Sequence, residues 1–205
     1  NVKVSHTTIS KWIRKYVEII DKYLGRFQVK VGDRWHADET LIRVRGKHMV
    51  LWLLLDSETR LLIAQHISEN KDSVEAAKLI EEGLRRAANK PIELVTDAAP
   101  QYAKALDEKV DLGDKPLIHI QAGISTPITN NKLERLHRTL KQRFKTIHNL
   151  NNEKTAETFS KGFAIFYNHI KKHKALNGKT PAQIAKNESD RTNWVKLIQK
   201  AKTND

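Results

Sequence analysis

The sequence contains no cysteine among its 205 residues. This absence excludes disulfide bonds and zinc sites built from cysteine, and it is compatible with a reducing cytoplasm. Long apolar runs are also missing, because the longest, residues 49–55, suits a buried strand and is far too short to span a bilayer. We therefore expect no membrane-spanning segment and no membrane partner.

No signal peptide is visible in this sequence, which begins with Asn1 rather than Met. The residues that follow Asn1 already have a helical pattern. We therefore expect the natural start of the protein to lie before Asn1.

Acidic residues are too few to balance the basic ones. The sequence has 24 Asp and Glu against 37 Lys and Arg, which gives a formal net charge of +13 and a pI near 9.8. A chain this basic favours a polyanionic partner, and nucleic acid is the leading candidate. The length allows one core of catalytic-domain size with small appendages at either end, and no internal repeat or low-complexity linker divides it.

Hydrophobic periodicity predicts a mixed α/β fold rather than an all-parallel stack. Alternating segments predict strands, and segments with apolar residues at helical spacing predict helices. The expected strands cover residues 35–44, 49–55, 61–67, 92–96 and 116–120, and the expected helices cover residues 72–88, 100–106, 129–144, 156–170 and 191–202.

A further helix is predicted after Ser5, which is a favourable N-cap residue. Residues 5–12 are similar to the second, recognition helix of a helix-turn-helix, whose short polar side chains reach base edges in DNA. The first helix of that motif would precede Asn1. An ordinary helix that docks on the core is an equal alternative. The basic residues beside its apolar stripe, which we expect to contact DNA, are Lys11, Arg14 and Lys15.

The helix predicted over residues 129–144 places one carboxylate in a basic segment. At about 100° per residue its apolar stripe comprises Leu133, Leu136, Leu140, Phe144 and Ile147. Glu134 lies on another face, together with Arg138, Lys141 and Lys145. Three roles stay open for Glu134: a capping box with Asn131 as the cap, a solvated ion pair, or a ligand that meets other carboxylates.

Two aspartates are candidates to meet Glu134. Asp38 lies inside a predicted strand, where alternation places it on the face opposite Ala37 and Glu39, and a buried charge there is costly unless it is paired. Asp97 directly follows a strand, at the edge where α/β proteins bind ligands, although a turn or N-cap role is common there. Three carboxylates without cysteine suit Mg²⁺ or Mn²⁺, and paired ions suit phosphodiester chemistry.

Four segments carry a family resemblance: residues 35–40 (WHADET), 95–102 (VTDAAPQY), 130–135 (NNKLER) and 167–176 (YNHIKKHKAL), the last followed by 179–181 (KTP). Their order and spacing resemble DDE transposases with a ribonuclease-H-like core, and within them the insertion-sequence-six group of bacterial and archaeal elements. The first three are similar to the motifs of the two Asp and the Glu, and the last resembles a tail shared with retroviral-type integrases. The resemblance covers nearly the whole chain.

The resemblance implies a catalytic triad of Asp38, Asp97 and Glu134 that binds two Mg²⁺ or Mn²⁺ ions. It implies cleavage of DNA strands at element ends, attack of 3′-hydroxyls on target DNA, and replicative cointegrate formation. A homodimer or larger assembly on paired ends and a cytoplasmic, nucleoid-associated location in a prokaryote are also implied. Further DNA contacts are expected at Arg138, Lys141, Lys145 and Asn131.

The implied fold is α/β, with a ribonuclease-H-like core whose five-stranded mixed sheet is flanked by helices over residues 31–150. Residues 1–30 would form a helix-turn-helix remnant and linker, and residues 151–205 a C-terminal helical extension. The short gap between Asp97 and Glu134 leaves no room for an inserted domain, and the family's complete helix-turn-helix is not contained in this sequence.

Other conspicuous side chains receive structural roles. We expect His36 and His119 to be hydrogen-bonded structural histidines and Trp52 to lie in the core. His169 and His173 are expected to pack or to contact the DNA backbone rather than bind a metal.

Two other functions stay open at the level of sequence. One is a catalytically inactive, DNA-binding derivative of a transposase, which suits the truncated start and the charge of +13. The other is a ribonuclease-H-like nuclease that acts on RNA in hybrids, because the same acids serve both chemistries.

Overall fold

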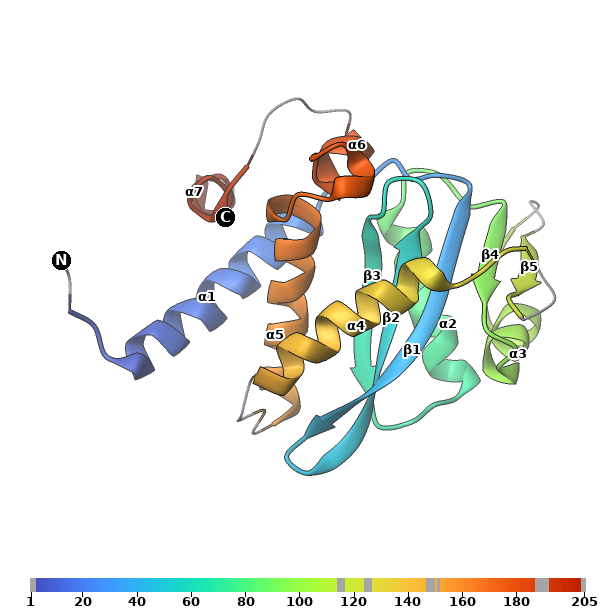
Figure 1. The fold of residues 1–205 in the computed structure, drawn as a ribbon, viewed down its shortest axis with the longest axis horizontal. Coiled ribbons are helices and arrows are strands. Elements are labelled where there is room, and N and C mark those ends of the chain that lie inside the picture. Colours follow the sequence, from blue (N-terminus) through green and yellow to red (C-terminus); the bar gives the residue numbers. More distant parts are fainter. Residues whose placement is uncertain are drawn as a thin grey trace.

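The centre of the protein is a five-stranded mixed sheet with the strand order β3-β2-β1-β4-β5 (Figure 1). The computed structural model describes residues 3–113, 117–123, 127–146, 150, 152–186 and 192–203, without the side chains of residues 145 and 146. The strands are β1 (Arg34–Val44), β2 (Lys47–Asp56), β3 (Leu62–Ser68), β4 (Glu93–Thr96) and β5 (Ile118–Gln121). The first three pair antiparallel, and β4 and β5 run parallel to β1, as predicted for a mixed sheet.

The central hairpin of β1 and β2 forms because β2 is an almost continuous apolar run that is buried on both faces. Arg45 and Gly46 connect the two strands with φ angles of 48° and 80°. Positive φ at both central residues suits a tight hairpin turn, and glycine adopts it without steric cost.

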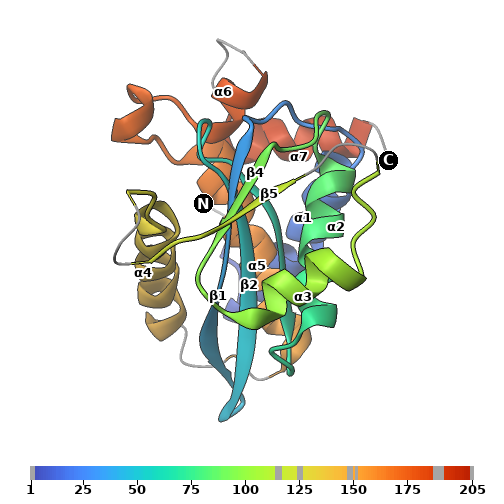
Figure 2. The ribbon, with the colours of Figure 1, turned by 90° about the vertical axis from the view of Figure 1, so that its right-hand side faces the viewer.

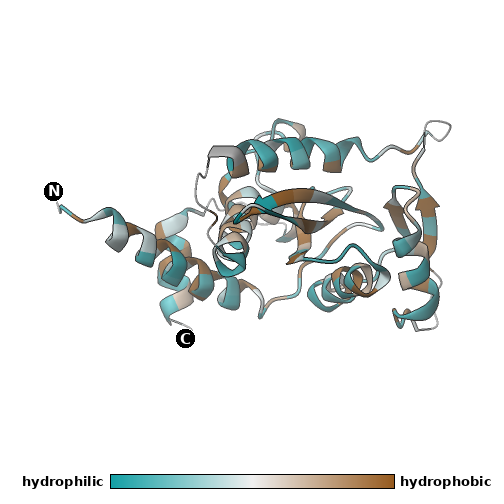
Figure 3. Cartoon of the chain, turned by 90° about the horizontal axis from the view of Figure 1, so that it is seen from below, coloured by the Kyte–Doolittle hydropathy of each residue, from teal (hydrophilic) through white to brown (hydrophobic). Residues whose placement is uncertain are grey.

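Helices cover both faces of the sheet (Figure 2). On one face, α2 (Ser73–Arg86) and α3 (Pro100–Glu108) pack on Trp35, Trp52 and Leu54. On the other, α4 (Asn131–Thr146) and α5 (Glu153–Ile165) pack on Leu51 and Leu53. Hydrophobic residues accordingly concentrate in the strands and on the helix sides that face them (Figure 3).

The N-terminal helix α1 (His6–Leu24) starts at Ser5, whose side chain accepts a hydrogen bond from the Thr8 backbone N–H. Its C-terminal half is buried against α5 and α7 (Trp194–Thr203) through Val17 and Ile20. The N-terminal half is open, and Trp12 is 46% exposed. The docking alternative therefore describes one half of α1, while the recognition-helix alternative stays a prediction for the other half.

The C-terminal part contains short helical segments between α5 and α7. Asn152 caps α5, so this helix begins earlier than the predicted residues 156–170, and it ends in a π-helix at Phe166–Ile170. A 3₁₀ turn at Lys174–Leu176 and α6 (Pro181–Lys186) follow. None of the described helices is long and apolar enough to cross a membrane.

Element boundaries otherwise differ from the predictions by a few residues, as is usual at frayed ends. The third strand is Leu62–Ser68, the helix predicted at 72–88 is α2, and the fifth strand is Ile118–Gln121. Pro116, Ile147 and Arg191, which the predictions included, lie outside the described residues. The remaining stripe residues of α4 are buried, as their spacing predicts.

Candidate active site

The candidate site lies where β1 and β4 diverge. Their last parallel pair joins His36 and Val95. Asp38 is two residues beyond His36 and still pairs with β2, whereas Asp97 is two residues beyond Val95, just after β4 ends. The register therefore places both aspartates at the same level of the sheet, at the edge where ligands gather in α/β proteins.

A third carboxylate joins them, and it is Glu39. One carboxylate oxygen each from Asp38, Glu39 and Asp97 lies within 4.8 Å of the other two. Glu39 points to the opposite face of β1 from Asp38, as strand alternation predicts, and it accepts a hydrogen bond of 2.6 Å from the Tyr102 hydroxyl. The ammonium of Lys71 lies 2.5 Å from Glu39 Oε1.

Burial and neighbouring charges raise the pKa of Asp38 to about 7, with burial the largest cause and Glu39 the next. A carboxyl in this state loses its proton when a cation arrives, because the cation favours the charged form. The backbone N–H of Glu39 donates to Asp38 Oδ1 at 2.9 Å and opposes part of the rise.

On the other side of Asp38 stands His137 from α4. Its Nδ1 is 3.5 Å from Asp38 Oδ2. Burial, with a smaller contribution from Lys141, lowers the pKa of His137 to about 4, so the imidazole is neutral at pH 7. Within the described part of the chain its buried Nε2 has no hydrogen-bond partner.

Glu134 is exposed on α4, one turn before His137, and the structure does not bring it into the group of three acids. Asn131 is the first residue of α4, so the capping-box alternative with Asn131 as the cap does not apply. No ion pair of Glu134 is found among the described residues. The triad that includes Glu134 thus stays a prediction.

The predicted DNA contacts lie on two helices, α4 and α1. Arg138, Lys141 and Asn131 are exposed on α4, and Lys11, Arg14 and Lys15 are exposed on α1. The side chain of Lys145 lies outside the described residues. Exposure makes these residues available to DNA, and their roles stay predictions.

A hydrogen-bond chain fixes the start of α4 beside the sheet. His36 Nδ1 is 2.8 Å from Asn130 Oδ1, and His36 Nε2 is 3.4 Å from Ser57 Oγ. The Lys132 ammonium donates to the same Ser57 oxygen at 2.5 Å and to the Ser57 carbonyl at 3.1 Å. These hydrogen bonds join the WHADET and NNKLER segments and confirm the structural role expected for His36.

Asp97 also shapes the turn after β4. Its Oδ1 accepts a hydrogen bond of 3.1 Å from the Ala99 N–H, and Ala99 rather than Asp97 is the N-cap position of α3. The preceding Thr96 hydroxyl is 2.8 Å from His119 Nε2, so His119 has the structural role expected for it. Because the turn uses one carboxylate oxygen, it is compatible with ligand binding by the other.

The donor set fits a hard divalent cation. Mg²⁺ and Mn²⁺ prefer carboxylate oxygens, and three of them converge here. Within the described residues this is the single group of three or more His, Asp or Glu side chains that meets the same spacing.

Sequence reasoning missed Glu39, Lys71, Tyr102 and His137 as members of the site. Glu39 and Tyr102 lie within recognised motifs, and His137 is three residues after Glu134 on a helix, so motif membership and helical spacing were available signals. Lys71 carries no such signal, because only the tertiary fold brings the segment between β3 and α2 to β1.

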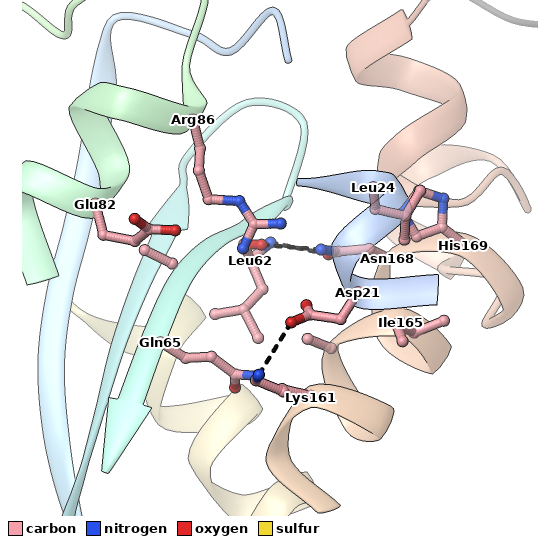
Figure 4. A pocket seen from close by; sticks show the side chains of 12 residues that line it. Asp21, Leu24, Leu62, Gln65, Glu82, Arg86, Lys161, Ile165, Asn168 and His169 are labelled. Atoms are coloured by element: carbon pink, nitrogen blue, oxygen red, sulfur yellow. Dashed lines mark hydrogen bonds and ion pairs between the residues drawn. The ribbon is translucent and has the colours of Figure 1, made fainter. Parts of the chain in front are cut away.

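A polar cavity of about 210 Å³ lies elsewhere, between α1, α2, β3 and α5 (Figure 4). Asp21 and Lys161 form an ion pair of 3.2 Å across it, and the Asn168 amide exchanges two hydrogen bonds with the backbone of Leu62. None of the three acids lines it. We interpret it as the polar joint that holds α1 and α5 against the sheet, and His169 lines it as a packing residue.

Trp52 and His173 have contacts that suit the structural roles expected for them. Trp52 is fully buried. His173 packs against Tyr167: its Nε2 lies 3.2 Å from the Tyr167 carbonyl, and the two rings meet edge to face.

Solved structures define the class of this fold. A chain of the simian T-cell lymphotropic virus intasome, solved with a PP2A regulatory subunit, matches with a TM-score of 0.58 at 17% identity, over 82% of this chain and 58% of that chain. The catalytic core of BIV integrase matches with a TM-score of 0.54 at 16% identity, over 76% and 95%. The fold is therefore that of the ribonuclease-H-like catalytic cores of retroviral integrases.

Sequence comparisons then give the family. The model of a family described as a DDE domain matches residues 32–173. The transposase for insertion sequence-like element IS431mec of Staphylococcus aureus (strain Mu50) is 28% identical over 174 residues, which cover 84% of this chain and 74% of that protein. The IS257 transposase of transposon Tn4003 from the same species matches equally. This chain belongs to the DDE transposase family, in the insertion-sequence-six group.

Proposed function

We propose that this chain is the catalytic domain of a transposase that cleaves DNA strands at the ends of an insertion sequence. The freed 3′-hydroxyls would then attack target DNA, by the replicative route that forms cointegrates. The observation that carries the proposal is the convergence of Asp38 and Asp97 at the divergence of β1 and β4, in a family of DDE transposases.

Asp38, Asp97 and Glu134 would hold two Mg²⁺ or Mn²⁺ ions, and one structural neighbour, the HTLV-2 integrase core, is a complex with magnesium. Such ions, when bound, stabilise the attacking and leaving oxygens of a phosphodiester displacement. Glu134 lies one helical turn before His137, whose Nδ1 is 3.5 Å from Asp38 Oδ2. The proposal requires α4 to shift so that the Glu134 carboxylate joins the two aspartates.

Arg138 and Lys141 extend from the Glu134 face of α4 and would bind the phosphates on either side of the reacting one. His137 on α4 is neutral at pH 7 and adds no charge beside Asp38, whose Oδ2 lies 3.5 Å from its Nδ1. Asp38, whose pKa burial raises to about 7, would release its proton when a divalent cation binds.

DNA would reach the site along the basic surface, with Lys11, Arg14, Lys15, Asn131 and Lys145 as further contacts. Support comes from the charge of +13 and from the exposure of the described members of this set. A homodimer or larger assembly on paired ends, working at the prokaryotic nucleoid, is part of the proposal; the HTLV-2 integrase core was solved in dimeric and trimeric forms.

Glu134→Gln tests the proposal in a strand-transfer assay with element-end DNA and Mg²⁺. We expect activity to fall by roughly a hundredfold or more, because a lost metal ligand removes several kcal/mol of transition-state stabilisation. DNA binding should be unchanged. Glu81→Gln, at an exposed position of α2, is the matched control and should retain full activity.

Three results would argue otherwise. Full Mg²⁺-dependent strand transfer by Glu134→Gln would remove Glu134 from the triad. Salt-dependent DNA binding by the wild-type chain without nicking in Mn²⁺ would identify an inactive derivative. Preferential cleavage of RNA in RNA–DNA hybrids would identify a nuclease of the ribonuclease H type.

A further inference from the structure

Lys71 places a positive charge inside the acidic cluster from an unexpected element. It belongs to the segment between β3 and α2, and its ammonium lies 2.5 Å from Glu39 Oε1. The Glu39 side chain is 4% exposed, whereas that of Lys71 is 50% exposed. The stem of Lys71 thus runs along the surface while its head reaches a buried carboxylate.

The Lys71 ammonium lies close enough to interact electrostatically with all three acids. Glu39 is its direct partner, and the oxygens of Asp38 and Asp97 lie within 4.8 Å of a Glu39 oxygen. Glu39, then Asp97 and Asp38, raise the pKa of Lys71, so the ammonium is charged at neutral pH. Among the described residues it is the one Lys or Arg that forms an ion pair with a member of this cluster.

We propose that Lys71 is a built-in counter-ion of the acidic cluster, which competes with the divalent cations and, once they displace it, binds a phosphate of the DNA substrate. The inference rests on the proposed function, because it assumes that Asp38 and Asp97 hold those cations. Nothing in the family motifs of this chain includes Lys71.

The surroundings of Glu39 allow Lys71 to leave. Glu39 keeps two neutral donors when the ammonium departs, the Tyr102 hydroxyl at 2.6 Å and the Gln101 amide at 3.3 Å. Its carboxylate therefore stays hydrogen-bonded and in place. Lys71 is followed by Asp72, which caps α2, so the backbone beside it is anchored and only the flexible side chain needs to move.

Electrostatics supplies the cause of the displacement. A divalent cation bound to the same group of oxygens repels an ammonium a few ångström away, and each weakens the binding of the other. A released lysine at the rim of the site is a mobile point charge suited to a phosphate oxygen. The Lys71 ammonium thereby moves from the metal-free cluster to a phosphate of the substrate.

The test is a titration of the full chain with Mn²⁺ in the absence of DNA. The electron paramagnetic resonance signal of the free ion measures how much Mn²⁺ stays unbound. Lys71→Met should bind Mn²⁺ about five- to tenfold more tightly than wild type, because it lacks the competing charge. Lys78→Met is the matched control: Lys78 is a half-exposed α2 lysine paired with Glu75 at 2.7 Å, and its loss should leave the affinity unchanged. Lys71→Arg, which keeps the charge, should resemble wild type.

A second arm measures DNA binding in the presence of Mn²⁺. Lys71→Met should bind DNA a few-fold more weakly. The negative slope of log K against log salt should become less steep by about one, as expected for one lost phosphate contact. A purely structural lysine would not produce a gain in metal affinity together with a loss in DNA affinity.

The outcomes separate this inference from the proposed function. One outcome is that Lys71→Met binds Mn²⁺ no more tightly than wild type, while Asp38→Asn abolishes the binding that wild type shows. That outcome overturns the role of Lys71 and leaves the proposed function standing. Wild-type protein that binds no Mn²⁺ overturns both. Should Lys71→Met fail to fold, Lys71→Gln gives the same comparison with a polar side chain of similar reach.

Discussion

Asn130 and His36 illustrate how one buried pair of side chains sets the position of a helix. Asn130 immediately precedes α4, and its amide oxygen is 2.8 Å from His36 Nδ1 on β1. Both side chains are at least nine-tenths buried. Because His36 is two residues from Asp38, the same contact aligns the helix that carries Glu134 with the strand that carries the first aspartate.

Asn130→Ala should therefore lower the free energy of unfolding by about 1–3 kcal/mol, because His36 is left with an unpaired buried nitrogen. Strand transfer should fall as well, since the start of α4 loses its anchor. Urea unfolding and the strand-transfer assay measure the two effects. Asn152→Ala is the control: it removes the cap of α5 and should cost about 1 kcal/mol without a change in activity per folded molecule. Equal activity of both variants would contradict the alignment role.

His169 makes stability depend on pH. Burial, and then Lys186 and Arg86, lower the pKa of His169 to about 4 in the folded protein, whereas an unfolded histidine titrates near 6.5. Below about pH 6.5 the unfolded chain binds a proton that the folded chain does not bind, so stability falls with pH between about 6.5 and 4 and is fully present above that range.

His169→Gln should remove this share of the acid sensitivity. Between pH 8 and pH 5 the wild-type protein should lose about 2 kcal/mol through His169, and the variant should lose less than wild type by about that amount. Urea unfolding at both pH values gives the difference. His137 shifts in the same direction and is present in both proteins, so it cancels in the comparison. Identical pH dependence of the two proteins would refute the assignment.

At the scale of elements, α4 shows what sequence periodicity reports well. Its stripe of leucines and Phe144 at helical spacing predicts a helix that docks on the sheet, and those side chains are buried against β1 and β2. The mixed order of strands and helices could be predicted for the same reason, because burial imposes one period on strands and another on helices.

Leu140→Ala tests the docking of α4. Leu140 is fully buried, so its truncation should cost about 2–5 kcal/mol through lost burial and the cavity that remains. Leu41→Ala, at a β1 position that is 59% exposed, should change stability by less than about 0.5 kcal/mol. Thermal or urea unfolding gives both values, and a small effect at Leu140 would show that α4 is loosely held.

Contacts between distant elements could not be predicted from periodicity. The grouping of Glu39 with Asp38 and Asp97 follows from the divergence of β1 and β4, and alternation alone placed Glu39 on the other face. The approach of Lys71 depends on the path of the chain between β3 and α2. The exposed position of Glu134 likewise reflects the rotation of α4 on the sheet, which spacing within one helix does not determine.

At the scale of the whole molecule, the acidic cluster and the basic half of α1 that we expect to contact DNA lie on separate parts of the fold. The acids gather where β1 and β4 diverge, while α1 packs on α5 and α7 beyond the β3 side of the sheet and extends away from it (Figure 1). The polar joint in Figure 4 connects the two parts through Asp21, Lys161 and Asn168. A net charge of +13 over this elongated surface suits a polyanion that contacts both.

The central claim is that Asp38, Asp97 and Glu134 together bind the divalent cations of a DDE transposase. Anomalous diffraction from crystals soaked in Mn²⁺ tests it most directly. We expect a Mn²⁺ peak between Asp38 and Asp97, with an oxygen of Glu134 also at a ligand distance of roughly 2.0–2.3 Å. A peak held by Asp38, Asp97 and Glu39 while Glu134 stays in solvent, or no peak at the divergence of β1 and β4, would contradict the claim.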